Sequence, residues 1–300
     1  MLNSRILTIE EAAAGIPDGS VVTVGGFGVF LQPMAMMREM IRQGKKDINL
    51  LSVGEAYAAD LLVGGGCVRS VTLASFGFEA VTGRSRNFCK AVEQGKVEVE
   101  DYSHFSMASR FLAGAMGLPF TAVHSMRGSD LLDHLPEGKK YVKMDCPFSG
   151  EEVILLPAAK PDIAVIQAQR ADMDGNLQLM GPTICIEEQA RAAKRVIAIV
   201  EEIVPRSVIQ ANPTATLLPS FFVDTLVVLP YSAHPMASYG YYDYDLEHLY
   251  TYTNSSKTPE SWKGYLDEYV YAPKDHYEYL ERVGGLRKIM QLRADPLLGY

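Results

Sequence analysis

The residues best suited to chemistry begin with a glycine-rich segment, Gly25-Gly26-Phe27-Gly28, between an apolar strand at 21–24 and a helix expected to start at Pro33. Glycines let backbone N–H groups approach a ligand closely, and the N-terminus of a following helix favours negative charge. The segment therefore indicates an anion-binding loop, although a tight turn that needs glycine explains it equally well. The chain contains neither G-x-G-x-x-G here nor G-x-x-x-x-G-K-S/T, so a dinucleotide-binding fold or an NTPase is not indicated.

Polar side chains follow two further predicted strands. Ser75 lies at the end of the strand at 68–74, and Ser103 and His104 follow the strand at 97–102. Residues at the carboxyl ends of parallel strands line the ligand crevice of open α/β sheets. Ser103 can donate to a substrate carboxylate, and His104 can donate or carry positive charge. The alternative is that Ser103 only caps a helix in which His104 is an exposed first-turn residue.

Strand and helix patterns alternate through the first half of the chain. Apolar strands are predicted at 21–24, 48–53, 68–74 and 97–102, and helices at 8–14, 34–42, 56–63, 86–94 and 105–116. Continuous apolar runs, in place of strict alternation, are typical of parallel strands that are covered on both faces. The pattern predicts an α/β fold, an open and mostly parallel doubly wound sheet with helices on both faces.

The second half carries more strands, at 152–156, 163–169, 195–204 and 221–229, and one helix near 186–194. We predict a loop-rich crossover at 132–150 and an exposed loop at 205–219. Twelve of the 16 tyrosines follow position 238, which suits an interface or a tail that wraps its own core. We expect one domain over residues 1–300, with a tyrosine-rich helical C-terminal extension from about 240.

Composition excludes several classes of function. The chain of 300 residues carries 28 Lys and Arg against 36 Asp and Glu, a formal charge of −8, which disfavours nucleic-acid binding. The N-terminus lacks the features of a signal peptide, and no apolar run is long enough to span a bilayer. The four cysteines form no CxxC pair and predict neither a zinc site nor a disulfide framework. We therefore expect a cytoplasmic protein without a metal.

Several motifs together resemble family I CoA-transferases. The N-terminal one combines Asp18-Gly19 with the strand and glycine segment at 22–27 and Pro33. Further matching stretches lie at 117–120, 128–130, 174–177, 200–205, 233–235, 242–245, 274–276 and 298–300. Several of these fit the glutaconate-type branch and its α subunits. Two residues depart from the general signature: Thr23 interrupts the apolar triplet, and Leu31 stands where the signature has glycine.

The resemblance implies a transferase that moves CoA between a short-chain or dicarboxylic acyl-CoA and a small carboxylic acid. Family members attack the thioester with a glutamate of the β subunit, in a Ser-Glu-Asn-Gly-like context that this chain lacks, since neither Glu55 nor Glu137 has it. The chain is thus expected to be an α subunit in an α2β2 or larger assembly. Residues 25–28 would form the oxyanion loop, and Ser75, Ser103 and His104 would contact the substrate. CoA itself is a substrate, and no cofactor is expected.

Two alternatives remain open from the sequence. An acyl-CoA decarboxylase or a ring-opening hydrolase could use the same two-subunit scaffold. In some hydrolases of this fold, the α chain carries a glutamate near the turn that holds His104, and Glu100 and Asp101 lie close to that turn here. The other alternative is a ligand-binding or regulatory protein of the same fold without turnover.

Overall fold

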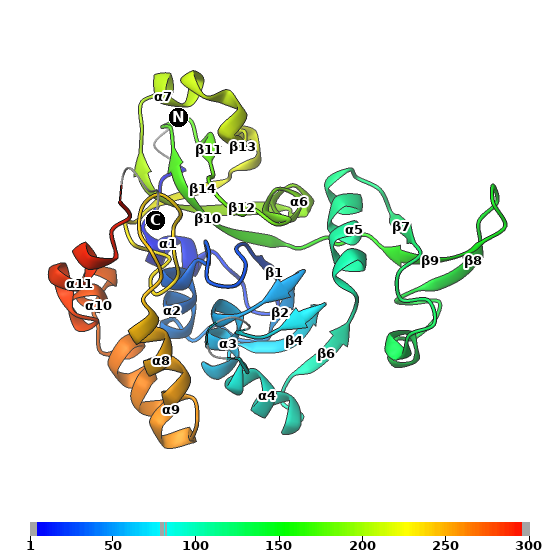
Figure 1. Ribbon diagram of the computed structural model, residues 1–300, viewed down its shortest axis with the longest axis horizontal. Helices are drawn as coiled ribbons and strands as arrows, with labels where there is room; N and C mark the ends of the chain where they lie inside the picture. The colour runs from blue at the N-terminus through cyan, green and yellow to red at the C-terminus, as the bar shows by residue number, and fades with distance from the viewer. Residues whose placement is uncertain (1–4, 79–80, 82, 296–300) are drawn as a thin grey trace.

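The centre of the molecule is a nine-stranded sheet in the part of the chain that the computed structural model describes, residues 5–78, 81 and 83–295 (Figure 1). The motif at 298–300 lies outside the described residues. The parallel strands are, in spatial order, β14 (Thr225–Val228), β12 (Arg195–Ile203), β10 (Ile163–Ala171), β1 (Val21–Val24), β2 (Ile48–Leu51), β4 (Val68–Leu73) and β6 (Glu98–Asp101). Two short antiparallel strands, β11 (Leu177–Gln178) and β13 (Thr216–Leu218), extend it beside β10.

Helices cover both faces of this sheet, which confirms the predicted α/β class. One face is covered by α1 (Ile9–Ala14), α2 (Met34–Arg42), α3 (Tyr57–Gly64) and α4 (Arg86–Glu93), and the other by α5 (His104–Ala115) and α6 (Ile186–Ala192). Strand β1 shows the alternation: Val22 and Val24 pack in the core of the first face, whereas Thr23 bonds to Gln189 of α6. Because both faces are buried, the strands need little polar alternation.

Local signals start these helices largely as predicted. Thr8 and Glu11 form a capping box at α1, and Ser103 is the N-cap of α5. Pro33 is the N-cap of α2, not its first helical residue. The segment at 205–219 is not the simple loop that we expected, because it folds into α7 (Arg206–Ala211), a 3₁₀ turn at Pro213–Ala215 and β13. Its prolines stand at helix starts, where a missing N–H costs nothing.

A second, antiparallel sheet projects from the body beside α5 (Figure 1). It consists of β7 (Phe120–Val123), β8 (Val142–Asp145) and β9 (Glu152–Pro157), in the order β7-β9-β8, and we call it the arm. The sequence prediction placed a loop-rich crossover at 132–150 and missed β7. The region holds a 3₁₀ turn at Asp130–His134 and strand β8, which pairing with β9 stabilises despite its weak local pattern.

The C-terminal tail wraps the body on the side opposite the arm (Figure 1). Its helices are α8 (Leu246–Ser255), α9 (Pro259–Leu266), α10 (His276–Arg282) and α11 (Gly285–Leu292), with a π-helical turn at Asp267–Tyr271. Tyr252 donates from its hydroxyl to Asp60 of α3 over 2.7 Å, and the Trp262 indole donates to the Gly64 carbonyl over 2.8 Å. The tail and sheet thus share one buried cluster, while their description as one domain stays a prediction.

The two interpretations of the tyrosines both hold, for different residues. Tyr242, Tyr252, Tyr265 and Tyr279 are buried against the chain's own core, whereas Tyr239, Tyr250, Tyr271 and Tyr277 are exposed.

A buried carboxyl group anchors the start of the tail. Glu201, at the end of β12, accepts from the hydroxyl of Tyr242 at 2.6 Å, the Gln167 amide at 2.8 Å and the backbone N–H of Tyr231 at 2.5 Å. Burial raises its pKa from 4.5 to about 8, against the opposing effect of these hydrogen bonds. Glu201 is therefore a scaffold residue that carries a proton at neutral pH.

This raised pKa predicts that the protein loses stability as pH rises. Below pH 4.5 both the folded and the unfolded carboxyl are protonated, whereas between 4.5 and about 8 only the folded one is. Raising the pH through this window therefore favours unfolding, by at most about 1.4 kcal/mol per pH unit for one such group. In Glu201→Gln, urea unfolding at pH 5, 6, 7 and 8 should show a shallower decline than the wild type. Glu98→Gln, on exposed β6, should keep the wild-type slope, and an unchanged slope in Glu201→Gln would contradict the assignment.

Candidate active site

The glycine segment forms a tight turn after β1. The Gly25 N–H donates to the Val165 carbonyl over 2.8 Å, and Phe27 and Phe30 exchange two backbone hydrogen bonds of 3.0 and 2.9 Å. Gly26 and Gly28 adopt positive φ angles of 99° and 58°. A Cβ on Gly26 would overlap the backbone of Leu31, so glycine is required there by close packing as well as by conformation.

Leu31 explains its own departure from the family signature. Its φ angle is 52°, in the left-handed region where glycine is favoured, and its N–H donates to the Ala237 carbonyl over 3.0 Å. The leucine side chain is 1% exposed and packs in the core cluster with Ala164 and Ile166. Burial of the side chain offsets the backbone strain, so a leucine can occupy a position that the backbone suits to glycine.

One buried side chain holds the turn in place. The Gln32 amide nitrogen donates to the Gly28 carbonyl, while its Oε1 accepts from the Ala58 N–H in the first turn of α3 at 2.7 Å. Gln32 is 2% exposed, so these bonds are shielded from water. The sequence analysis did not single it out; the only signal was a polar residue between Leu31 and the buried helix α2.

Three of the predicted site residues converge on a glycine that was not predicted. Gly54 lies in the short strand β3 (Gly54–Glu55), paired in parallel with β5 (Ser75–Phe76). A Cβ on Gly54 would lie 2.9 Å from Ser75 Oγ, 3.2 Å from a ring carbon of Phe27 and 3.6 Å from His104 Nε2. Ser75 Oγ and His104 Nε2 are themselves 3.0 Å apart. Phe27, Ser75 and His104 therefore meet at the carboxyl ends of β1, β4 and β6.

Ser103 lies beside this group but is already engaged. Its hydroxyl accepts from the Ser106 N–H at 3.1 Å and donates to Ser125 over 3.1 Å. The capping interpretation of Ser103 is thereby confirmed, and its contact with a substrate stays a prediction.

A polar network runs beneath the site and accounts for Thr23. The Gln189 amide donates to Thr23 Oγ1 over 2.9 Å and to Ser52 Oγ over 3.4 Å, and Ser52 in turn hydrogen-bonds the Glu55 carboxyl. Burial raises the pKa of Glu55 from 4.5 to about 8. A protonated carboxyl is a poor nucleophile, so Glu55 is a weak candidate for attack on a thioester.

Other candidates lie elsewhere. Glu100 pairs with Lys140 at 2.5 Å, and His234 is buried between Tyr279 and Asp245. Among the described residues, no three His, Cys, Asp or Glu gather as a metal site would require. Within the same ranges, no helix is long and apolar enough to cross a membrane.

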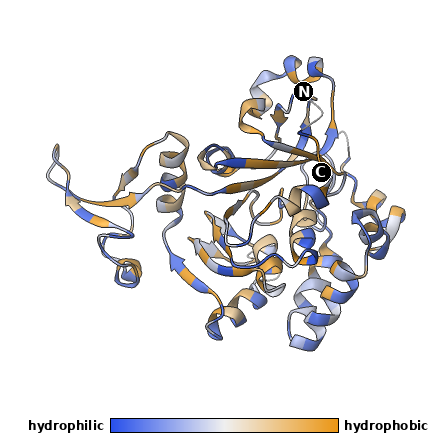
Figure 2. Ribbon diagram, turned by 180° about the vertical axis from the view of Figure 1, so that it is seen from behind, coloured by the Kyte–Doolittle hydropathy of each residue, from blue (hydrophilic) through white to orange (hydrophobic). Residues whose placement is uncertain are grey.

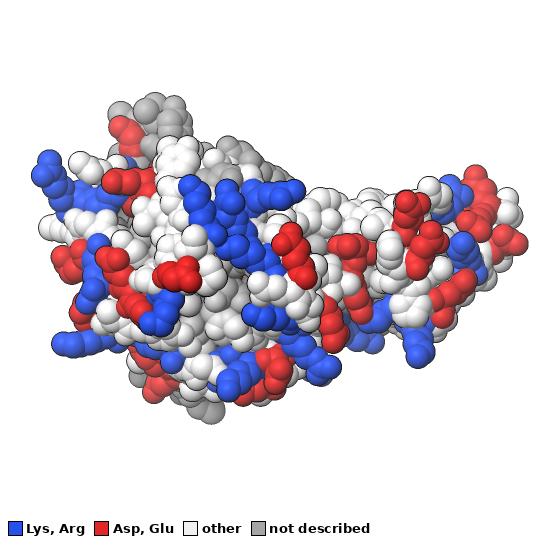
Figure 3. Space-filling view, turned by 90° about the horizontal axis from the view of Figure 1, so that it is seen from below, with Lys and Arg blue, Asp and Glu red and all other residues white. Residues whose placement is uncertain are grey.

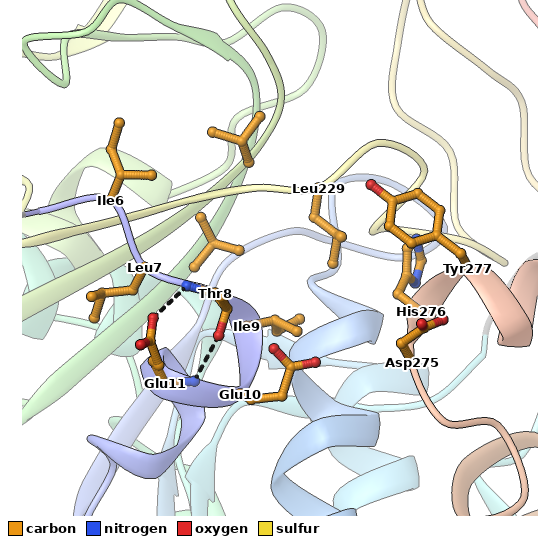
Figure 4. Close-up of a pocket in the computed structure, with 12 residues that line it drawn as sticks. Ile6, Leu7, Thr8, Ile9, Glu10, Glu11, Leu229, Asp275, His276 and Tyr277 are labelled. Carbon is orange, nitrogen blue, oxygen red and sulfur yellow. Dashed lines mark hydrogen bonds between the residues drawn. The ribbon is translucent and has the colours of Figure 1, made fainter. Parts of the chain in front are cut away.

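A cavity of about 410 Å³ lies at the edge of the main sheet, away from this group (Figure 4). It is lined by residues 6–11, 227–229 and 275–277. The Glu11 carboxylate there is used in the cap of α1, where it accepts from the Thr8 N–H at 3.0 Å. None of the predicted site residues is among the described residues that line this cavity.

Comparison with known proteins agrees with this geometry. The family model described as coenzyme A transferase matches residues 6–229. The chain is 36% identical to the α-type subunit of glutaconate CoA-transferase from Acidaminococcus fermentans, over 99% of this chain and 97% of that one. It is 35% identical to the α-type subunit of 3-oxoadipate CoA-transferase from Pseudomonas knackmussii, over 93% and 98% of the two chains. It is also 39% identical to an uncharacterized protein of Archaeoglobus fulgidus, spanning 66% of that longer relative.

Solved structures give the same result. The crystal structure of the Acidaminococcus fermentans glutaconate CoA-transferase superposes with a TM-score of 0.92, at 35% identity and covering 99% of this chain and 98% of that chain. The decarboxylase AibA/AibB superposes with a TM-score of 0.77 at 34% identity, covering 88% and 98%. The chain therefore belongs to the coenzyme A transferase family. Within that family it is an α-type subunit, as the glutaconate and 3-oxoadipate relatives are.

The left-handed backbone at Leu31 predicts an unusual order of variant stabilities. Leu31→Gly and Leu31→Ala both remove the buried side chain, but only glycine relieves the positive φ angle. We expect Leu31→Gly to be more stable than Leu31→Ala by about 1 kcal/mol in urea unfolding. At Leu50, equally buried in β2 and outside the left-handed region, the order should reverse because glycine loses more chain entropy. The same order at both positions would refute the assignment.

Proposed function

We propose that this chain supplies the oxyanion loop and part of the acyl pocket of a CoA-transferase whose nucleophilic glutamate belongs to a β subunit. The observation that carries the proposal is the convergence of Phe27, Ser75 and His104 around Gly54, next to the glycine turn. Polar donors and an oxyanion loop are present there without a carboxylate suited to attack. A second chain is the source that the family resemblance implies.

In the proposed reaction, the partner's glutamate attacks the thioester carbonyl, and CoA leaves as the thiolate from an acyl-glutamyl anhydride. The thiolate then attacks the glutamyl carbonyl, which releases the first carboxylic acid and leaves a glutamyl-CoA thioester. A second carboxylate takes CoA by the same steps in reverse. Each attack puts negative charge on a carbonyl oxygen. In the described part of the chain, the N–H groups of Gly26 and Gly28 have no acceptor, so they are available to stabilise it.

Ser75 and His104 are placed to select the acyl group. If His104 Nε2–H donates to Ser75 Oγ, the Ser75 hydroxyl hydrogen is left to donate to a substrate carboxylate. Two of the relatives carry the names of dicarboxylic acids, glutaconate and 3-oxoadipate. Both points support a short dicarboxylic acyl-CoA, with a small carboxylic acid as acceptor. CoA enters this proposal as a substrate, and the assembly is a cytoplasmic α2β2 or larger heteromer.

The second candidate is a decarboxylase on the same scaffold. The 34% identity to AibA/AibB supports it, since that protein is named a decarboxylase. The two candidates differ in what the partner chain contributes, because only the transferase needs a glutamate there.

A direct assay separates these activities. The purified chain, alone and with its presumed β subunit, receives glutaconyl-CoA and labelled acetate, and products are followed by mass spectrometry. We expect labelled acetyl-CoA only when both chains are present, because the nucleophile and the oxyanion loop lie on different chains. A decarboxylated thioester or free CoA without labelled acetyl-CoA would contradict the transferase in favour of the second candidate or a hydrolase.

The crowding around Gly54 predicts a matched pair of variants. Gly54→Ala places a methyl group 2.9 Å from Ser75 Oγ and 3.2 Å from Phe27, so these side chains must shift. We expect kcat/KM of the two-chain complex to fall by roughly 10- to 100-fold. Gly264→Ala in α9, where a Cβ meets nothing within 4 Å, should leave it unchanged. Full activity in Gly54→Ala, with wild-type folding by circular dichroism, would show that this group is not the acyl site.

A further inference from the structure

We propose that the outer face of the arm, together with an apolar stripe on α5, is the docking surface for the subunit that carries the nucleophile. This inference rests on the proposed function, because it takes the missing nucleophile to come from a second chain. It adds a location on this chain and a set of residues for that contact.

The strand pairing places apolar residues on one face of the arm. Residues directly opposite each other in paired strands share a face. The pairs are Phe120 with Pro157, Ala122 with Leu155, Leu155 with Val142, and Val153 with Met144. Every residue on this outer face is apolar.

The inner face of the arm already has its partner. Val123, Ile154 and Leu156 are buried against Met107 and Phe111 of α5. An antiparallel sheet with one packed face usually presents polar residues on the other. The arm departs from that rule, which indicates that a partner covers its outer face.

The outer face is open to solvent in the isolated chain. Phe120, Val142 and Met144 are 50%, 43% and 44% exposed. A hollow of about 220 Å³ lies on this face, bounded by Phe120, Tyr141, Val142 and Pro157 among others. A hollow of this kind can receive one aliphatic or aromatic side chain, as the central anchor residues of protein interfaces do. Figure 2 shows the hydrophobic segments of the arm in orange.

A second apolar surface links this face to the candidate site. Phe105, Leu112 and Met116 are 65%, 49% and 65% exposed on α5. Their spacing of seven and four residues places them along one side of the helix. The stripe begins directly after His104, and it ends four residues before Phe120. Exposed apolar residues thus run from the acyl site to the arm.

This continuity identifies the occupant as the chain that completes the site. A protein seated on the α5 stripe lies next to His104, where the nucleophile must arrive. A second copy of this chain fits less well, because it has no glutamate in the required sequence context. Figure 3 shows acidic and basic side chains scattered along the arm with uncharged surface between them. Such a polar rim around an apolar centre is typical of protein–protein interfaces.

The test measures binding between the purified chain and its presumed β subunit. In Phe120→Asp/Val142→Asp we expect the Kd for the β subunit, by analytical ultracentrifugation, to rise about 100-fold, because two buried charges replace apolar anchors. Leu286→Asp, 72% exposed on α11, should bind like the wild type. Binding by the double variant within threefold of wild type would overturn the proposal. Loss of self-association with unchanged β-subunit binding would assign the face to a second copy and overturn it too.

A second measurement does not depend on variants. Hydrogen exchange of the wild-type chain should slow in residues 120–123 and 142–145 and in the exposed side of α5 when the β subunit is added, and unchanged exchange there would overturn the proposal. Failure of the proposed function looks different. The complex would form through this face, and exchange would slow, yet labelled acetyl-CoA would not appear.

Discussion

The position of the candidate site depends on the Gln32 carboxamide. It donates to the Gly28 carbonyl and accepts from the Ala58 N–H at 2.7 Å, so one side chain ties the glycine turn to the first turn of α3. Strand β3, with Gly54, leads directly into that helix. The turn and Gly54 are therefore held relative to each other by a short, buried connection, which is what a preorganised oxyanion site requires.

The C-terminal tail supports the same turn from the other side. Ala237 accepts from the Leu31 N–H and donates to the Val29 carbonyl, so the start of the tail is bonded to both ends of the glycine turn. Glu201 fixes that part of the tail through Tyr242 and Tyr231. The tail thus does more than cover the core, because its first residues brace the turn that the reaction would use.

The opposite side of the molecule has a different character. The body and tail bury their aromatic side chains, whereas α5 and the arm leave Phe105, Met116 and Phe120 exposed. An α chain that cannot act alone needs a rigid site and an open surface beside it. The structure separates these two requirements: the tail stabilises the turn on one side, and the exposed surface of α5 lies next to His104 on the other.

The two departures from the family signature also become intelligible together. Thr23 and Leu31 flank the glycine turn. The hydroxyl of Thr23 accepts from Gln189 in the buried network, and Leu31 fills the core while its backbone takes a left-handed conformation. Each residue satisfies a packing or hydrogen-bonding need that only its neighbours in space reveal.

The sequence by itself determined the fold class, the glycine turn and the family, because apolar runs, glycines and capping residues act over a few neighbouring positions. It also indicated Ser75 and His104, since strand ends are readable from local pattern. Only the tertiary structure decided that these two side chains meet at 3.0 Å beside Gly54. Gln32, the arm and its apolar face were decided there too, because their roles arise from contacts between segments far apart in the chain, which no local pattern records.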